Sequence, residues 1–312
     1  MIRLTKFIWL LILLPGIFSC EIRKETDGRP KNSADTMYVG TYNIRIITPI
    51  GKGSRAWENR RQYVASIIDN YSYDVIGLQE ILNYNQLNDL KHLLPNYSFL
   101  TVGQDNVAGT KGEMIAIVYD KGRFHVRQSG FFFLSPTPKI PSIGWDASTN
   151  RVCQWAKMYD TFTFTEFYFF NTHFNWSGNL SRADGAKLVT QMIDSLAVGY
   201  PVFSVGDFNA PNTELPFYHQ MTSVLRDSRT VSVEAPLGSF GTFNNWDTSK
   251  AAFAKYERMD YVFEKDFDVL SYAILNEKFV FNTWPSDHFP VFVSVVMKNK
   301  FSFKNAKKTY IL

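Results

Sequence analysis

Trp284-Pro285-Ser286-Asp287-His288-Phe289-Pro290, near the end of the 312-residue chain, places an acid and a histidine side by side after a Pro-Ser turn. The apolar residues Val291 to Val296 follow, and such a run is typical of a buried strand. A strand that begins in this way can hold a metal ligand or a general acid–base pair rigidly. A capped turn before an edge strand is the competing interpretation, and this stretch alone does not decide between them.

Four further segments share the pattern of an apolar strand bordered by polar residues that can bind a ligand. They are Tyr42-Asn43, Gln79-Glu80, Thr172-His173-Phe174-Asn175 and Gly206-Asp207-Phe208-Asn209. Taken singly, each is also explained as a solvated turn, a satisfied core histidine or, for Asn209, a helix cap. Five such segments, rich in hard oxygen donors and with two histidines, favour one shared site.

The hydrophobic periodicity predicts many strands and few helices. Helices are expected at 54–70, 85–94 and 180–198, with a short one from Thr213. Strands are expected at 37–47, 74–80, 97–102, 114–119, 124–134, 151–159, 162–172, 201–205, 258–263, 267–275 and 289–297. Strands with so few helices between them predict two packed sheets flanked by helices, within a single domain.

The N-terminus has the pattern of an export signal. Basic residues in Met1 to Lys6 precede an apolar run from Phe7 to Phe18, which is too short to span a membrane. Cys20 follows the small residue Ser19 and resembles a bacterial lipoprotein cleavage site, with an ordinary signal peptide as the alternative. We therefore expect a signal peptide at 1–19, a lipidated tether at 20–36, and an exported, membrane-anchored lipoprotein of the outer membrane, periplasm or cell surface of a bacterium.

Charge and cysteine content narrow the function classes. If Cys20 carries the lipid, only Cys153 remains and no intrachain disulfide can form. The formal net charge is +4, but the basic residues concentrate in the leader and in a predicted tail at 298–312, which has lysines and no acids. The residues between these ends carry a small net negative charge, so the composition does not support polyanion binding by the core.

From about Tyr38 to Val296 the chain resembles the endonuclease/exonuclease/phosphatase superfamily, with the motifs in family order. The bacterial secreted branch is most similar, at Gly144-Trp145-Asp146-Ala147, at Arg151 to Ala156 and at Trp284 to Pro290. The resemblance implies an α+β fold over 37–297, a four-layer α/β sandwich of two packed, mixed, mainly antiparallel sheets. It also implies a divalent-metal-dependent phosphoester hydrolase, with a phosphodiesterase of nuclease type and in-line attack by water as the first expectation.

The same resemblance assigns metal ligands and catalytic groups. Glu80 is the principal ligand of Mg²⁺ or Mn²⁺, with Asn43 and Asp287, since such ions prefer hard oxygen donors. Asp207 positions or deprotonates the attacking water. Asn209 donates a hydrogen bond to the phosphoryl oxygens as negative charge develops there.

Two histidines and a rim of polar residues complete the implied site. His288 contacts the scissile phosphate as a donor or as the base for the water, and Asp260 orients its imidazole. His173 lies against the phosphate. Arg151 and Glu113 are further substrate-binding residues, Arg151 through its charge and Glu113 from the rim of the site.

The chain departs from the family pattern at Asn175. The resemblance also assigns this residue to phosphate binding. The secreted branch commonly has His-x-Asp where this chain has His173-Phe174-Asn175. Asparagine keeps the oxygen ligand but removes a charge, which weakens any role for this position in holding a second metal.

Several alternatives remain open from the sequence. The site residues suffice for water attack without a covalent nucleophile, and Cys153 has the neighbours of a buried strand residue. The alternatives are a phosphomonoesterase or a sphingomyelinase-like phospholipase of the same fold, and a non-catalytic binding lipoprotein. Candidate substrates are nucleic acid, nucleotide, phospholipid head group or sugar phosphate, and we expect a monomer held at the membrane by its lipid.

Overall fold

The structure is a computed structural model that describes residues 35–47, 53–82, 84–106, 108–249, 257–276, 278 and 283–298. All of these residues fall in one compact unit, Ser33–Leu312. The predicted signal peptide, nearly all of the predicted tether and the tail beyond residue 298 lie outside the described residues. Among the described helices, none is long and apolar enough to cross a membrane.

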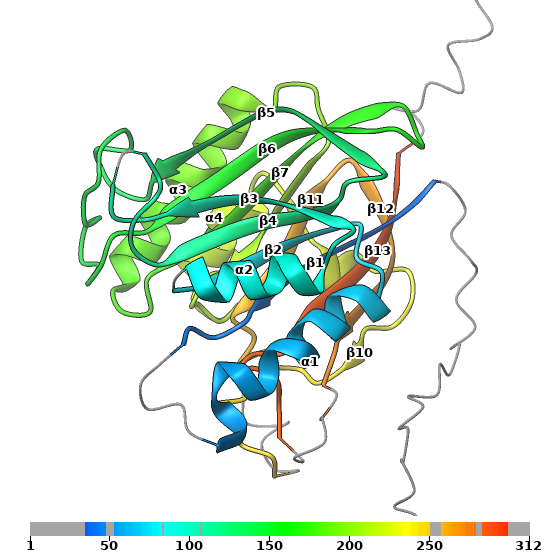
Figure 1. Cartoon of the computed structure of the whole chain (residues 1–312). Coiled ribbons are helices and arrows are strands. Elements are labelled where there is room, and N and C mark those ends of the chain that lie inside the picture. Colours follow the sequence, from blue (N-terminus) through cyan, green and yellow to red (C-terminus); the bar gives the residue numbers. More distant parts are fainter. Residues whose placement is uncertain are drawn as a thin grey trace, which may run out of the picture. The chain divides into compact units, whose positions relative to one another are not determined.

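Figure 1 shows the strands and helices of the chain, with runs of consecutive strands from β3 to β7 and from β10 to β13. The strands are β1 (Thr36–Asn43), β2 (Val75–Ile81), β3 (Tyr97–Gly103), β4 (Met114–Asp120), β5 (Phe124–Phe133), β6 (Val152–Asp160), β7 (Thr165–His173), β8 (Val202–Asp207), β9 (Arg226–Asp227), β10 (Leu237–Gly238), β11 (Asp260–Lys265), β12 (Phe267–Ile274) and β13 (Val291–Met297). The helices are η1 (Gly53–Arg55), α1 (Trp57–Asn70), α2 (Tyr84–Leu93), α3 (Asn179–Leu196), α4 (Leu215–Thr222) and α5 (Ser228–Val231).

The strands form two mixed sheets, which confirms the predicted architecture. Sheet 1 has seven strands in the order β10-β12-β13-β1-β2-β4-β3, and sheet 2 has six in the order β5-β6-β7-β8-β11-β9. Most neighbours are antiparallel, whereas the pairs β1–β2, β7–β8 and β10–β12 are parallel. The two parallel pairs β1–β2 and β7–β8 lie in the interior of their sheets, where both faces are covered.

Three apolar layers hold these elements together. One lies between the two sheets, one between sheet 1 and helices α1 and α2, and one between sheet 2 and helices α3 and α4. The period-two alternation of β7 shows how a strand serves two layers: Phe167 and Phe169 face sheet 1, whereas Tyr168 and Phe170 face α3. Two sheets and two helical layers make the four-layer sandwich.

The differences from the expected elements are small and local. β7 begins at Thr165 rather than at Phe162, because residues 161–164 form the turn that joins it to β6. The two-residue strands β9 and β10 and the single turn of α5 were not predicted, since such short elements have no periodicity to detect.

Candidate active site

The topology brings the predicted strand ends to one edge of the sandwich. In sheet 2, His173 and Asp260 are the residues opposite Asp207 on its two neighbouring strands. In sheet 1, β1 and β2 run parallel, so Asn43 lies opposite Gln79, directly before Glu80. Because β13 runs antiparallel to β1, the segment that leads into β13 returns to the same edge.

Asn43 links the two sheets at this edge. Its side chain is fully buried, and Nδ2 donates to Glu80 Oε1 and to Asp207 Oδ2, both at 2.9 Å. Two carboxylates from different sheets are therefore held on either side of one amide. A buried amide that donates two hydrogen bonds to ionised oxygens fixes both acceptors strongly.

Glu80 reaches the site through an unusual backbone conformation. Its φ is 62°, in the left-handed region, and the pairing of β2 with β4 shifts register between Leu78 and Ile81. Its second oxygen, Oε2, accepts from the backbone N–H of Ile46 at 3.1 Å. The carboxylate is buried and fixed at both of its oxygens.

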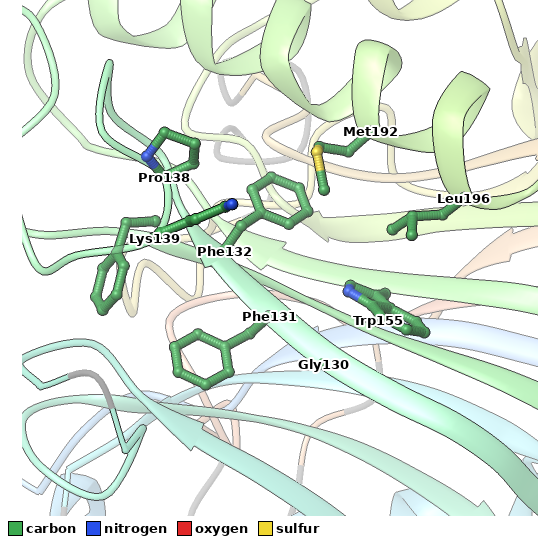
Figure 2. A pocket seen from close by; sticks show the side chains of 9 residues that line it. Gly130, Phe131, Phe132, Pro138, Lys139, Trp155, Met192 and Leu196 are labelled. Atoms are coloured by element: carbon green, nitrogen blue, oxygen red, sulfur yellow. The ribbon is translucent and has the colours of Figure 1, made fainter.

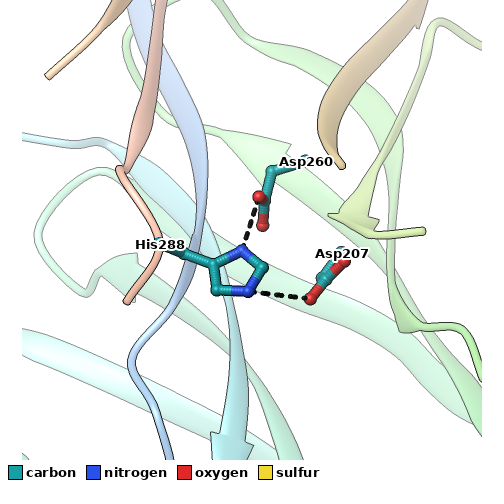
Figure 3. Close-up of side chains that lie close together, drawn as sticks. All are labelled: Asp207, Asp260 and His288. Carbon is teal, nitrogen blue, oxygen red and sulfur yellow. Dashed lines mark hydrogen bonds and ion pairs between the residues drawn. The ribbon is translucent and has the colours of Figure 1, made fainter. Parts of the chain in front are cut away.

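His288 and Asp260 form a buried pair beside Asp207 (Figure 3). His288 Nδ1 lies 2.8 Å from Asp260 Oδ2, and His288 Nε2 lies 3.7 Å from Asp207 Oδ2. Burial alone lowers the pKa of His288, but Asp260 and Asp207 outweigh it and raise the pKa to about 10. The raised pKa favours the protonated imidazole, which can donate from Nε2.

His173 is held in the same way by a different acid. Its Nδ1 lies 2.8 Å from Glu113 Oε1, and its Nε2 lies 3.6 Å from Asp207 Oδ2. Arg151 Nη1 donates to the same Glu113 oxygen at 2.8 Å. Burial raises the pKa of Glu113, but His173 and Arg151 outweigh it and lower the pKa to about 2.

Both ring nitrogens of His173 have close polar neighbours. Asn209 Nδ2 lies 3.0 Å from Nε2, and Arg151 Nη1 lies 2.9 Å from Nδ1, beside Glu113 Oε1. These contacts fix the orientation of the ring. Asn209 itself has a φ of 49°, which asparagine tolerates, and its backbone N–H donates to Asp207 Oδ1 at 2.9 Å. The turn after β8 thus fixes both Asp207 and Asn209.

Asp287 lies next to Glu80 across a guanidinium group. Arg45 Nη1 is 3.5 Å from Glu80 Oε2, and Arg45 Nε is 3.4 Å from Asp287 Oδ2. Ser286 Oγ donates to the carbonyl oxygen of Asn43 at 2.7 Å, which attaches the Ser-Asp-His segment to the end of β1. The structure thus brings together the three residues that the sequence predicted as metal ligands.

Asn175 is the predicted residue that the structure does not connect to this cluster. Its Oδ1 accepts from Ser148 Oγ at 3.1 Å and from Thr149 Oγ1 at 3.3 Å, and its Nδ2 donates to Ser177. These hydrogen bonds fix the 144–150 loop to the start of the α3 segment. Glu113, in contrast, does more than line the rim, because it is the partner of His173.

The role of Glu113 was missed from the sequence. The one signal for it is a carboxylate directly before the buried strand Met114–Asp120, the same pattern that marked the other site residues. The pairing of this carboxylate with His173 depends on the adjacency of strands far apart in the sequence, which the pattern of a single strand does not contain. Arg45 was missed as well, because an exposed arginine after a strand has no pattern of its own.

The donors present fit a hard divalent cation. Glu80, Asp287 and Asn43 offer oxygens, and the Arg45 guanidinium already places positive charge between the two carboxylates. A second group, Asp207, Asp260 and His288, also has ligand atoms within 4.8 Å of one another. We favour the first set, because His288 and Asp260 are already paired with each other and the first set consists of oxygens alone.

A separate hollow lies away from these residues, between β5, β6 and α3 (Figure 2). It has a volume of about 420 Å³ and none of the predicted site residues lines it; its walls are Gly130, Phe131, Phe132, Phe133, Pro138, Lys139, Trp155, Met192 and Leu196. Its lining is mainly apolar and aromatic, with Lys139 as its one charged residue. The polar cluster at the strand ends is therefore the candidate active site, because it holds the carboxylate and imidazole side chains that the hollow lacks.

Comparison with known proteins agrees with this fold. A protein of the endonuclease/exonuclease/phosphatase family from Bacteroides thetaiotaomicron superposes with a TM-score of 0.77 at 33% identity, over 84% of this chain and 98% of that one. A mannosyl-6-phosphatase of the same organism superposes with a TM-score of 0.75, also at 33% identity, over 84% and 100%. Danio rerio TDP2, in complex with a single-strand DNA product, shares the fold at 16% identity, over 83% and 98%, with a TM-score of 0.64.

Fold, site and relatives together define the class as hydrolases of phosphoesters. Residues 40–288 match the Endonuclease/Exonuclease/phosphatase family. The chain belongs to that family. The resemblance inferred from the strand-end motifs is thereby confirmed, and enzymes of this family generally depend on a divalent metal.

Proposed function

We propose that this protein hydrolyses phosphoesters by direct attack of water, with Asp207 at the centre of the reaction. The observation that carries the proposal is the convergence of two imidazoles on one carboxylate oxygen. Nε2 of His173 and Nε2 of His288 lie 3.6 Å and 3.7 Å from Asp207 Oδ2. An anion-binding space bordered by two ring nitrogens, with a carboxylate acceptor beside it, suits a phosphoryl group and an attacking water.

The residues around this oxygen then have different roles according to their charge. Asp207 accepts the proton of the water or orients that water, because the carboxylate is held by Asn43 and by the backbone of Asn209. His288 is charged at neutral pH and donates to a phosphoryl or leaving oxygen, with Asp260 holding its other nitrogen. Of the two roles expected for His288, donor and base, its raised pKa favours the donor.

His173 and Asn209 face the same space from the other side. Glu113 and Arg151 hold the His173 ring from behind. Asn209 donates from Nδ2, and that amide can turn toward a phosphoryl oxygen in place of the ring nitrogen. Developing negative charge on the phosphorus oxygens therefore meets donors that already lie beside Asp207, and only the Asn209 amide has to turn.

Glu80, Asp287 and Asn43 would hold the divalent cation. Mg²⁺ or Mn²⁺ bound there supplies positive charge that neutralises phosphate oxygens and lowers the pKa of nearby water. The role of the protein is to present side-chain oxygens from the ends of β1 and β2 and from the segment before β13. Removing the cation with EDTA should abolish hydrolysis if this assignment is correct.

For the substrate, we place a phosphate monoester of a sugar first. The supporting observation is that a relative with 33% identity over its full length is a mannosyl-6-phosphatase. The small negative charge of the chain between its basic ends also argues against a long polyanion. A phosphodiester, the expectation from the motifs alone, is the second candidate, and a phospholipid head group the third.

A substrate panel separates these candidates. The purified protein is assayed with Mn²⁺ or Mg²⁺ on mannose 6-phosphate, p-nitrophenyl phosphate, bis-p-nitrophenyl phosphate, single-stranded DNA, RNA and sphingomyelin. We expect mannose 6-phosphate to be cleaved with a kcat/KM at least tenfold above that for the diesters. Cleavage confined to nucleic acid would exclude the sugar monoester, and no cleavage together with no cation binding would favour the non-catalytic alternative.

The cellular location of the protein is a separate proposal. We propose that it is exported and anchored through lipid on Cys20, on the basis of the leader sequence alone. Cys20→Ser should move the protein from the membrane fraction to the soluble fraction of the cells that make it. An unchanged distribution would reject the lipid anchor and leave the proposed chemistry untouched.

A further inference from the structure

Glu80 reaches the site only because β2 contains a bulge. Leu78 pairs with Ala116 and the next pair is Ile81 with Met114, so two residues of β2 oppose the single residue between Met114 and Ala116. Strict alternation would place Glu80 on the same face as Leu78, under helices α1 and α2. The bulge instead returns Ile81 to that apolar layer and leaves Glu80 at the sheet edge.

One buried amide of the opposite sheet donates hydrogen bonds to the backbone at this bulge. Asn171, near the end of β7, is fully buried and donates from Nδ2 to the carbonyl oxygen of Leu78 at 3.1 Å and to that of Ala116 at 2.9 Å. These two carbonyls belong to the last residue pair before the register shift. A side chain of sheet 2 thus fixes the backbone of both strands of sheet 1 where the bulge begins.

The same amide also fixes the first residue of the bulge. Gln79 Nε2 donates to Asn171 Oδ1 at 2.8 Å and to Thr41 Oγ1 at 2.9 Å, and Gln79 is itself fully buried. A continuous chain of hydrogen bonds therefore runs from β1 through β2 to β7. Gln79, which belongs to this chain of hydrogen bonds, is the residue directly before Glu80.

Gly77 provides the space for this contact. A Cβ added there would lie 2.4 Å from Asn171 Oδ1 and 2.6 Å from Val205 Cγ2, closer than atoms can approach. The polar chain crosses an otherwise apolar layer between the sheets. Buried polar groups in such a layer are costly unless every one is satisfied, so this chain holds one backbone arrangement in preference to others.

We propose that Asn171 is a positioning residue for the metal ligand Glu80, acting across the sheet interface through the bulge. Glu80 has a left-handed φ of 62°, which a glutamate adopts only where its surroundings impose it. The contacts of Asn171 impose it, together with the hydrogen bond from Ile46 to the carboxylate. The inference rests on the proposed function in one respect, the assignment of Glu80 to the cation.

The decisive variant is Asn171→Leu, which keeps the number of heavy atoms and the branching at Cγ and removes the hydrogen bonds. Mn²⁺ affinity is measured by titration calorimetry, and we expect it to fall at least tenfold, as for other residues that orient a metal ligand. Asp160→Asn is the matched control, since Asp160 is also fully buried and polar but pairs with Arg123 at the far end of β6. Its Mn²⁺ affinity should stay within twofold of the wild-type value.

A milder variant covers the case in which Asn171→Leu does not fold. Thr41→Val is isosteric and removes only the two hydrogen bonds between Thr41 and Gln79 at the end of the chain, and we expect Mn²⁺ affinity to fall about threefold. Hydrogen exchange of the amides of residues 78–81, measured without any metal, should be faster in both variants than in the Asp160→Asn control.

The outcomes are distinct for the two claims. Wild-type protein that binds no Mn²⁺ would refute the cation site, whereas the exchange measurement would still test the support of the bulge. Wild-type Mn²⁺ affinity and wild-type exchange at residues 78–81 in folded Asn171→Leu would overturn the inference.

Discussion

At the scale of single residues, the charge of His288 depends on Asp260. The pKa of this imidazole is raised to about 10 because two carboxylates outweigh the effect of burial. Asp260→Asn removes the nearer carboxylate, so the pKa should fall toward the ordinary value of 6.5. We expect an NMR titration of the histidine side chains in EDTA to show this as a decrease of at least two pH units.

The same shift has a consequence for stability. A raised histidine pKa stabilises the folded protein fully below pH 6.5, and this stabilisation is lost as the pH rises through about 10. The free energy of unfolding of the wild type should therefore decline between these values, and that of Asp260→Asn should decline less. A His288 that titrates near 6.5 in the wild type would contradict the assignment of its charge.

For Glu113, the predicted change of stability with pH has the opposite sign, because its pKa is lowered and not raised. Its pKa is lowered to about 2 from an ordinary 4.5, so its ionised form stabilises the fold above pH 4.5 and this stabilisation is lost as the pH falls toward 2. The excess stability of the wild type over Glu113→Gln should therefore shrink by about 2 kcal/mol between pH 5 and pH 3, from about 1.4 kcal/mol per pKa unit. Urea unfolding at a series of pH values measures this difference.

A matched control for Glu113→Gln is Glu166→Gln. Glu166 also pairs with a cation, Lys157 Nζ at 2.8 Å, but its side chain is 30% exposed and it lies outside the site. Its effect should be nearly independent of pH over the same range. Equal pH dependence for the two variants would show that the pair of Glu113 with His173 has no special strength.

At the scale of elements, the two sheets are joined at the far end by a buried ion cluster. Arg123, 1% exposed, contacts Asp74 beside β2 at 3.0 Å and Asp160 at the end of β6 at 2.8 Å. Removing one member of a buried pair leaves the other charges unpaired. We expect Arg123→Met to lower the free energy of unfolding by about 3–5 kcal/mol, with no change in Mn²⁺ affinity.

Arg61→Met tests whether burial is the reason. Arg61 pairs with Asp89 at 2.9 Å, a distance similar to those of the buried cluster, but its side chain is 43% exposed. Solvated pairs contribute about 0–1 kcal/mol. Comparable losses in the two variants would mean that the cluster around Arg123 does not join the sheets more strongly than a surface pair.

The elements also show where prediction from sequence succeeds and where it fails. Asp207 lies at the end of β8 as predicted, because a polar residue beside an apolar run marks a strand end directly, whereas β13 begins only at Val291, four residues after Asp287. The bulge at Glu80 was not predictable, since its cause is Asn171, 91 residues further along the chain and in the other sheet. A pattern within one strand contains no information about a side chain that reaches it from outside.

At the scale of the whole molecule, the adjacency of strand ends decides the site. The order of β7, β8 and β11 in sheet 2 sets His173 and Asp260 on either side of Asp207. This order is a property of long-range pairing, and the periodicity of each strand leaves it undetermined. The family resemblance provided it, and for that reason the catalytic cluster was anticipated whereas the contacts of Glu113, Arg45 and Asn175 were not.

Cation binding should be visible in the stability of the whole fold. A ligand present at 100 times its Kd stabilises the native state by about 2.7 kcal/mol. Saturating Mn²⁺ should therefore raise the Tm of the wild type and should raise that of Glu80→Gln much less. A matched control is Glu214→Gln, because Glu214 pairs with Arg182 away from the proposed cation ligands. The same increase in all three proteins would place the cation elsewhere.

The rate of phosphate release with Mn²⁺, measured for the wild type, Asp207→Asn and His288→Gln on the best substrate of the panel, tests the central claim most directly. Asp207 Oδ2 lies 3.6 Å from Nε2 of His173 and 3.7 Å from Nε2 of His288, so both variants change this arrangement. We predict that each variant loses at least 10³-fold in kcat/KM while remaining folded, and that EDTA abolishes wild-type activity. Variants that keep activity within tenfold of the wild type, or wild-type activity that survives EDTA, would contradict it.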